Sequence, residues 1–224
     1  MALHYKVSLL GARNPSVWRI IVMSDNATYF DLHHAIQQAF DWWDYHLFRF
    51  EPGKPKQRLP RSEDWAIVDT SIEEDWGEEQ LIEARTAPLI NKGQLATRFW
   101  YTYDYGDSWN LEIRLILYNP AEKGSGQCVA RKGASPHEDC GGISGFENLK
   151  YYCAKDQYGT ATAQEIDEIQ SYRVWLGLED NEVWDAEVGR CRKDLVTATR
   201  KAWKKEASAY NARLKAIDKQ HEID

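Results

Sequence analysis

The strongest constraint on the fold is a pair of β-rich runs joined by a short acidic turn. Residues 95–103 (LATRFWYTY) and 109–118 (WNLEIRLILY) are rich in aromatic and β-branched side chains, and five residues separate them. Two such runs joined by a short segment that contains glycine are typical of an antiparallel hairpin. We therefore predict a hairpin here, and any fold for this chain must contain antiparallel sheet.

The first fifty residues predict more sheet and one helix. Residues 3–10 alternate apolar and polar with a period of two, and residues 17–23 form a second β-rich run, so a hairpin is expected. Thr28, with Asp31 three residues later, is typical of a helix start, and Leu32, Ile36 and Phe40 then recur at helical spacing. Residues 47–50 predict a strand that returns to the sheet.

The rest of the chain is less regular. Residues 51–64 contain three prolines and predict an exposed loop. We predict a short strand at 66–70, a solvated turn or helix start at 72–79, and one helical turn at 88–92, while 80–85 fits strand or helix. Residues 119–145 predict a long connection, and a short helix follows from about Phe146. A further helix follows Thr162 and Glu165, which have capping-box spacing, and stops at Gly177.

Strands come first and helices last, which predicts an α+β fold with an antiparallel sheet, helices packed on it and a C-terminal amphipathic helix. We expect a single domain over residues 1–188 and a basic helical extension over 189–224, with its helix at 189–219. That extension holds 10 Lys and Arg against 5 Asp and Glu, although the whole chain has a net charge of −7.

Composition excludes several classes of protein. Hydrophobic residues make up 43% of the chain and charged residues 28%, an ordinary globular balance. No apolar run approaches the roughly 18 residues of a membrane span, and the first residues lack a signal-peptide pattern. We therefore expect a cytoplasmic protein without membrane contact. Its four cysteines are expected to be thiols rather than disulfides.

Five residues are candidates for catalysis: His46, Asp104, Asp107, Glu138 and Asp139. Asp104 and Asp107 lie three residues apart at the hairpin tip, where a carboxylate pair could bind a metal or act as acid and base. The alternative is that Asp and Gly simply form the turn. His46 could be a general base, or it could pack among its aromatic neighbours.

Cys128, His137 and Cys140 are residue types that zinc accepts, but their spacing lacks the two tight ligand pairs of a closed site. We therefore expect no metal there. We expect instead a Gly-Gly turn whose acidic neighbours cap the helix near Phe146. His33 and His34 are consecutive on a helix, so at most one is expected to reach a site.

The C-terminal helix carries a basic stripe that includes Lys193, Arg200, Lys201 and Lys204. These side chains could contact the phosphates of a nucleic acid. The alternative is that the stripe faces solvent or the molecule's own acidic residues.

Three blocks of sequence together resemble the plasmid pRiA4b ORF-3-like family. They are Leu32-His33 through His46-Leu47-Phe48-Arg49-Phe50, the hairpin Y-D-Y-G-D-S-W, and P-H-E-D-C-G-G-I-S-G-F, followed by W-L-G-L at 175–178. The chain departs from the family pattern at Ser135 and His137, where the family tends to have cysteine and proline, and at Leu111, where it often has histidine.

The resemblance implies a protein of unestablished activity from plasmids and other mobile elements. We hypothesise that the fold gathers the three blocks into a binding groove lined by Trp42, Trp43, Tyr103 and Trp109, with the four candidate acids and His46 beside it. The leading function is a non-catalytic binding module for a protein or nucleic acid, without a cofactor. The alternative is a metal-dependent hydrolase that uses the clustered Asp, Glu and His residues.

Overall fold

The computed structural model describes residues 1–52, 65–72 and 80–221 of the 224-residue chain. Its contacts divide the chain into two compact units, which we describe separately. The first unit consists of residues 1–10 and 19–129, and the second of residues 11–18 and 130–224. Most of the predicted loop at 51–64 and most of the predicted turn at 72–79 lie outside the described residues.

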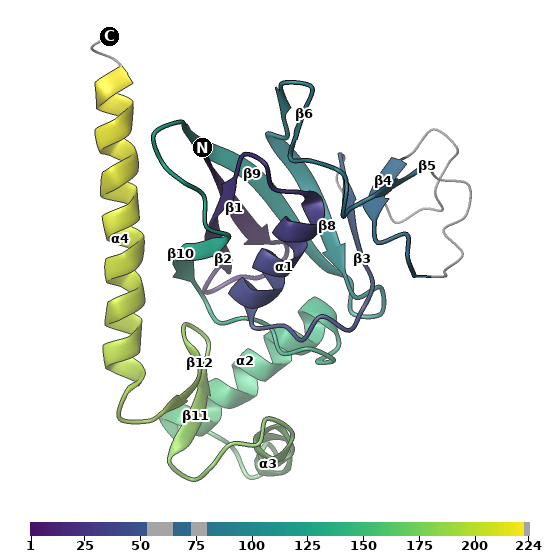
Figure 1. The fold of residues 1–224 in the computed structure, drawn as a ribbon. Helices are drawn as coiled ribbons and strands as arrows, with labels where there is room; N and C mark the ends of the chain where they lie inside the picture. The colour runs from purple at the N-terminus through teal and green to yellow at the C-terminus, as the bar shows by residue number, and fades with distance from the viewer. Residues whose placement is uncertain (53–64, 73–79, 222–224) are drawn as a thin grey trace. The chain divides into compact units, whose positions relative to one another are not determined.

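An eight-stranded sheet, most of whose residues belong to the first unit, is the main feature of that unit (Figure 1). Its order is β10-β2-β1-β9-β8-β3-β4-β5. The strands are β1 (Ala2–Leu9), β2 (Trp18–Ser24), β3 (Phe48–Glu51), β4 (Trp65–Val68), β5 (Gln80–Glu83), β8 (Arg98–Tyr103), β9 (Trp109–Asn119) and β10 (Gln127–Lys132). The pair β4 and β5 is parallel, whereas β1 with β9, β3 with β8 and β8 with β9 are antiparallel.

The predicted central hairpin is confirmed. Strands β8 and β9 pair from Arg98 with Arg114 to Tyr103 with Trp109. Asp104 and Ser108 adopt left-handed backbone angles at the two ends of the turn, and the Asp104 Oδ1 accepts a hydrogen bond of 2.9 Å from the Gly106 N–H. The alternative that Asp and Gly form the turn therefore has a physical basis, because an Asp side chain can accept a hydrogen bond from the backbone N–H two residues later.

The predicted first helix is also confirmed as α1 (Tyr29–Phe40). Thr28 and Asp31 form the expected capping box, in which each side chain accepts a hydrogen bond from the other residue's backbone N–H. Leu32, Ile36 and Phe40 are all buried. Tyr29 packs edge-on against Phe50 at 5.1 Å between ring centroids, so α1 rests on the sheet.

Two predictions for the first unit are wrong. Residues 88–92 do not form a helical turn, because β6 (Ile90–Asn91) and β7 (Gln94–Leu95) form a small hairpin around Lys92 and Gly93, both at positive φ. The predicted connection at 119–145 contains the strand β10 instead. The stretch is polar and rich in glycine, and β10 has apolar side chains at only a few positions, so no strand pattern was evident in the sequence.

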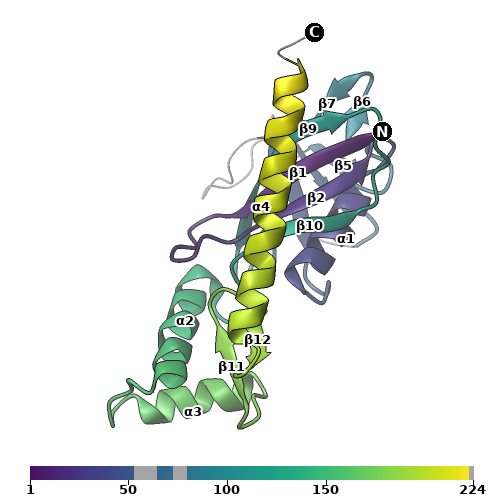
Figure 2. The same ribbon diagram turned by 90° about the vertical axis from the view of Figure 1, so that its left-hand side faces the viewer.

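The second unit contains α2 (Gly142–Tyr158), α3 (Ile166–Trp175), the hairpin of β11 (Glu182–Asp185) and β12 (Gly189–Arg192), and α4 (Val196–His221), as Figures 1 and 2 show. The N-cap of α2 is Gly141, without a side-chain cap. The predicted acidic cap near Phe146 is therefore wrong. The predicted helix at 189–219 begins only at Val196, since residues 189–192 pair with β11.

The α+β prediction with a mostly antiparallel sheet and a C-terminal helix is confirmed. The division into residues 1–188 and 189–224 stays a prediction about domains. Within the described residues, every helix is too short or too polar to cross a lipid bilayer.

Candidate functional site

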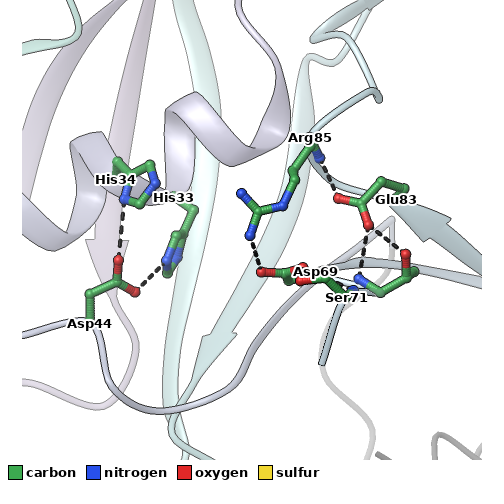
Figure 3. Close-up of polar contacts among 8 residues, drawn as sticks. His33, His34, Asp44, Asp69, Ser71, Glu83 and Arg85 are labelled. Atoms are coloured by element: carbon green, nitrogen blue, oxygen red, sulfur yellow. Dashed lines mark hydrogen bonds and ion pairs between the residues drawn. The ribbon is translucent and has the colours of Figure 1, made fainter. Parts of the chain in front are cut away.

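The first unit brings two histidines and one aspartate together beside α1 (Figure 3). The Asp44 carboxylate lies 2.6 Å from the His33 Nε2 through one oxygen and 3.2 Å from the His34 Nδ1 through the other. One potential ligand atom from each residue lies within 4.8 Å of the other two. We call these three residues the His-His-Asp cluster.

Asp44 explains how two consecutive histidines share one site. It follows α1 in a left-handed conformation, with φ of 60°, and its two carboxylate oxygens face different rings. Consecutive helical positions differ by about 100°, so the expectation was that at most one histidine reaches a site. That expectation is wrong, because the bridging carboxylate spans the angle between them.

The buried side of the cluster is fixed by aromatic and amide groups. The His33 ring stacks on Phe48 at 3.7 Å between centroids, and its Nδ1 lies 2.8 Å from the Tyr101 hydroxyl. The Gln37 amide donates to the same hydroxyl over 3.0 Å. A polar chain therefore runs from Gln37 through Tyr101 and His33 to Asp44.

The protonation states along this chain follow from burial and charge. Burial lowers the pKa of the His33 imidazole, and this effect outweighs the hydrogen bond with Asp44. Burial alone would raise the pKa of the Asp44 carboxyl, but the hydrogen bond and charge of His33, together with His34, lower it. Burial raises the pKa of the Tyr101 hydroxyl well above its ordinary value. Neutral His33 beside ionised Asp44 is the consistent state.

A second polar network in Figure 3 serves the scaffold. Arg85 donates to the Asp69 carboxylate over 2.6 Å and lies 3.9 Å from the centroid of the Phe30 ring. The Asp69 carboxylate also accepts hydrogen bonds from the Ser71 hydroxyl and N–H. The Glu83 carboxylate accepts from the Arg85 N–H over 2.7 Å. These residues belong to no sequence motif, so nothing in the sequence marked them.

The aromatic residues predicted to line a groove lie mostly in the interior. Trp42 stacks on Tyr103 at 5.0 Å and lies 6.1 Å from Trp109, and all three are buried. Trp43 is 61% exposed. Among these four residues, Trp43 alone presents its ring to solvent in the described structure, so the other three do not line an open groove.

The predicted catalytic residues fall in both units. In the first unit the His46 Nε2 lies 3.8 Å from the Asp104 Oδ2, and Asp107 is half-buried near the end of the turn. Glu138 and Asp139 belong to the second unit, where Glu138 is buried and Asp139 is exposed at a positive φ. Their role as one acidic site stays a prediction.

The weak metal candidates are also divided between the units. Cys128 belongs to the first unit, and His137 and Cys140 belong to the second. The His137 Nδ1 lies 2.9 Å from the Glu138 carbonyl oxygen, and its ring lies 4.4 Å from that of Trp175. The Cys140 thiol points to the Gly142 carbonyl at 3.9 Å. The His137 contact with Glu138 and the Cys140 contact with Gly142 are local, whereas the ring contact joins His137 to α3.

A pocket of about 350 Å³ lies beside the first half of α4 in the second unit. Two tryptophans, four basic side chains and one acid contribute to its lining. The full lining is Trp18, Arg131, Lys132, Gly133, Glu187, Val188, Arg200, Trp203, Lys204, Ala207, Ser208 and Asn211. We call this space the α4 pocket.

The predicted nucleic-acid residues differ in their partners. Arg200 binds the buried Asp185 carboxylate through two nitrogens, with the Nε at 3.1 Å, and this contact raises the pKa of Arg200. The Lys204 Nζ lies 3.5 Å from the Glu187 carboxylate, and Lys193 donates to the Asp180 carbonyl over 2.8 Å. Lys201 is exposed. The alternative, in which the basic stripe contacts the molecule's own acidic residues, thus holds for part of the stripe.

Arg131 is one of the four basic residues that line the pocket. Its guanidinium lies 5.2 Å from the centroid of the Trp203 ring and 3.6 Å from the Glu206 carboxylate. The Arg131 Nε is buried and donates no hydrogen bond within the described residues. A guanidinium nitrogen of this kind has an unused capacity for an acceptor.

Comparison with family models decides the relationship that the three sequence blocks suggested. The model described as plasmid pRiA4b ORF-3-like protein matches residues 1–189. The chain belongs to this family. The match to the pRiA4b ORF-3-like model ends at the first residue of β12, so α4 lies beyond it.

Two individual proteins are similar to this family member. The uncharacterized protein y4hQ of Sinorhizobium fredii (strain NBRC 101917 / NGR234) is 30% identical over 138 residues, which are 60% of this chain and 64% of that protein. The alignment thus spans less than two thirds of the relative. The crystal structure of the protein of unknown function MM3350 from Methanosarcina mazei Go1 is 31% identical, with a TM-score of 0.59, over 83% of this chain and 93% of that one.

Proposed function

We propose that this protein is a non-catalytic binding protein for single-stranded nucleic acid, and that the α4 pocket receives a base and its phosphate. The single observation that carries the proposal is the composition of this pocket. Trp18 and Trp203 line it together with Arg131, Lys132, Arg200 and Lys204. Proteins that bind single strands combine aromatic rings, on which bases stack, with basic groups that follow the phosphates.

The size of the pocket suits one nucleotide unit better than a protein surface. Small-ligand pockets occupy about 300–1,000 Å³, and the α4 pocket has about 350 Å³. Trp18 and Trp203 are half-buried, so each keeps part of its surface open to a ligand. A flat base can add stacking area there.

The charges of the pocket favour an anion at modest cost. Lys204 is 72% exposed and its partner Glu187 is 36% exposed. An exposed pair of this kind contributes about 0–1 kcal/mol, so a phosphate can replace Glu187 as the partner of Lys204. Arg200 is different, because the buried Asp185 holds it. We therefore assign phosphate contact to Lys204 and Arg131, and a structural role to Arg200.

The metal-dependent hydrolase remains the alternative function. It would use His46, Asp104 and Asp107 with Glu138 and Asp139. The Asp104 Oδ1 already accepts the Gly106 N–H, and this engagement gives the hydrolase less support than the pocket gives the binding protein.

The experiment is a fluorescence-anisotropy titration of a labelled oligothymidylate with the full-length protein. Affinity should fall as salt rises from about 50 to about 200 mM, because bound phosphates release counterions. Lys204→Gln should weaken binding and reduce the salt slope by about one. Lys215→Gln removes the same charge from an exposed position of α4 outside the pocket, and it should leave both quantities unchanged.

Three results would count against the proposal. They are an absence of binding, binding that salt does not weaken, and an equal loss of affinity in the Lys204 and Lys215 variants. Equal affinity for a duplex of the same length would remove the single-strand part of the proposal.

A further inference from the structure

We propose that the His-His-Asp cluster binds one divalent transition-metal ion, with His33, His34 and Asp44 as its ligands. This inference goes beyond the proposed function and does not depend on it, because all three residues belong to the first unit and the α4 pocket to the second. Two imidazole nitrogens and one carboxylate oxygen form a ligand set that suits ions such as Zn²⁺, Fe²⁺ or Co²⁺. Three protein ligands leave coordination positions open.

The distances allow one ion to reach all three residues. Metal bonds of about 2.0–2.2 Å separate neighbouring ligand atoms by about 3 Å or slightly more. The two nitrogen–oxygen distances are 2.6 and 3.2 Å, and the cluster's ligand atoms lie within 4.8 Å of one another. Small side-chain rotations would place an ion between them. His34 is 46% exposed, although its ring packs edge-on against Phe30 at 4.4 Å, whereas His33 is buried between Tyr101 and Phe48.

His33 has the supporting contacts of a metal ligand. A ligating histidine usually uses its other ring nitrogen to hold its orientation through a hydrogen bond. In His33 the Nε2 faces Asp44 and the Nδ1 faces the Tyr101 hydroxyl, while the ring lies on Phe48. The nitrogen that would bind the metal is therefore aimed at the other ligands, and the opposite nitrogen is anchored in the interior.

The hydrogen-bond chain can also accommodate the proton that metal binding displaces. An ionised Asp44 can only accept, so in the metal-free state a neutral His33 donates its Nε2–H to Asp44 and its Nδ1 accepts from the Tyr101 O–H. When a metal takes the Nε2, the Nδ1 must carry a proton and donate to the Tyr101 oxygen. The Tyr101 O–H then needs a new acceptor. The Gln37 Oε1 is buried and accepts no hydrogen bond within the described residues, and rotation of this amide would supply one.

Solvent can reach the cluster from the side of His34. The Asp44 side chain is 33% exposed. His34 also contributes to a polar hollow of about 350 Å³ whose lining includes Asp31, Gln38 and residues 124–126. An ion can therefore enter without opening the core, and water or a further ligand can fill the remaining positions.

The test is a calorimetric titration of chelator-treated, full-length protein with Zn²⁺ alone. We expect one saturable site, with affinity weakened at least about tenfold by Asp44→Asn and by His34→Ala. Asn tolerates the left-handed backbone of position 44, so this variant should keep its fold. Asp41→Asn is the matched control, since Asp41 is also exposed and left-handed but lies outside the cluster. Its affinity should equal that of the unsubstituted protein.

Nitrogen NMR of the two imidazoles gives an independent readout. Zn²⁺ should shift the His33 Nε2 and the His34 Nδ1 together, at one equivalent of metal. The proposal is overturned if the unsubstituted protein shows no saturable binding, if Asp44→Asn binds as tightly as Asp41→Asn, or if the two ring nitrogens do not respond. In each of these cases the cluster is a hydrogen-bonded support for α1 and nothing more. Failure here leaves the nucleic-acid titration unaffected.

Discussion

At the scale of single residues, Tyr101 is the positioning residue of the His-His-Asp cluster. Tyr101→Phe removes the hydroxyl that faces the His33 Nδ1 and keeps the buried ring. We expect Zn²⁺ affinity to fall by about tenfold, the usual effect of losing a supporting contact to a ligating histidine. The measurement is the same calorimetric titration.

A purely structural role for Tyr101 would give a different result. The variant would then unfold more easily, by about 1–3 kcal/mol for an unsatisfied buried group, while the folded fraction bound Zn²⁺ with unchanged affinity. Thermal unfolding in the absence of metal separates the two contributions. An unchanged Zn²⁺ affinity in folded Tyr101→Phe would contradict the positioning role.

Residue types indicated which side chains could form a site, but they did not predict where the fold places those side chains. Trp42, Tyr103 and Trp109 were expected to line a groove where the three sequence blocks meet, yet all three pack in the interior. Helical geometry predicted that the His33 and His34 rings point in different directions. Both rings nevertheless contact the carboxylate of Asp44, whose backbone is left-handed. A positive φ at a non-glycine residue has no reliable sequence signal, so the cluster could not be predicted from the sequence.

At the scale of elements, Glu165 links α2 to the start of α3. Its carboxylate accepts hydrogen bonds of 2.8 Å from the Lys155 ammonium and the Tyr151 hydroxyl, and also from Thr162. The Lys155 contact is the main cause that lowers the pKa of Glu165 to about 2, and Thr162 and Tyr151 add to it. This group lies at the surface, so its contribution depends on solvent screening.

The lowered pKa predicts how stability depends on pH. A carboxyl whose pKa falls on folding stabilises the native state above its unfolded pKa, and this contribution is lost as pH falls through the folded pKa. For Glu165 the window runs from about 4.5 down to about 2. We expect the unfolding temperature to fall more between about pH 5.5 and about pH 3 in the unsubstituted protein than in Glu165→Gln.

Glu168→Gln is the control for this pH dependence, because Glu168 lies exposed on the same helix. Its unfolding temperature should follow the pH dependence of the unsubstituted protein. If Glu165→Gln showed the same acid sensitivity as Glu168→Gln, the Glu165 contacts would not contribute to holding α2 and α3 together.

Long patterned elements were predictable and short ones were not. The capping box at Thr28 and the two runs around the acidic turn define α1 and the β8–β9 hairpin from local sequence. The hairpin of β11 and β12 has four residues in each strand and too few alternations to give a pattern. Residues 189–192 form β12 in this hairpin, so α4 starts later than the helical periodicity of the sequence predicted.

At the scale of the whole molecule, the C-terminal segment has the opposite sign of charge to the chain as a whole. The chain has a net charge of −7, yet residues 189–224 carry an excess of basic side chains. A ligand attracted to the whole surface would be cationic, whereas one attracted to the α4 pocket is anionic. The family match ends at residue 189, so α4, with Lys204 and Trp203, lies beyond the matched part.

The measurement that tests the central claim most directly is photo-crosslinking of a halogenated single-stranded oligonucleotide, with the linked peptides identified by mass spectrometry. Bases that stack on tryptophan crosslink to the ring they touch. We predict crosslinks at Trp18 and Trp203, suppressed by unlabelled oligonucleotide and by high salt. Crosslinks confined to the exposed Trp43, with none at the two pocket tryptophans, would contradict the account.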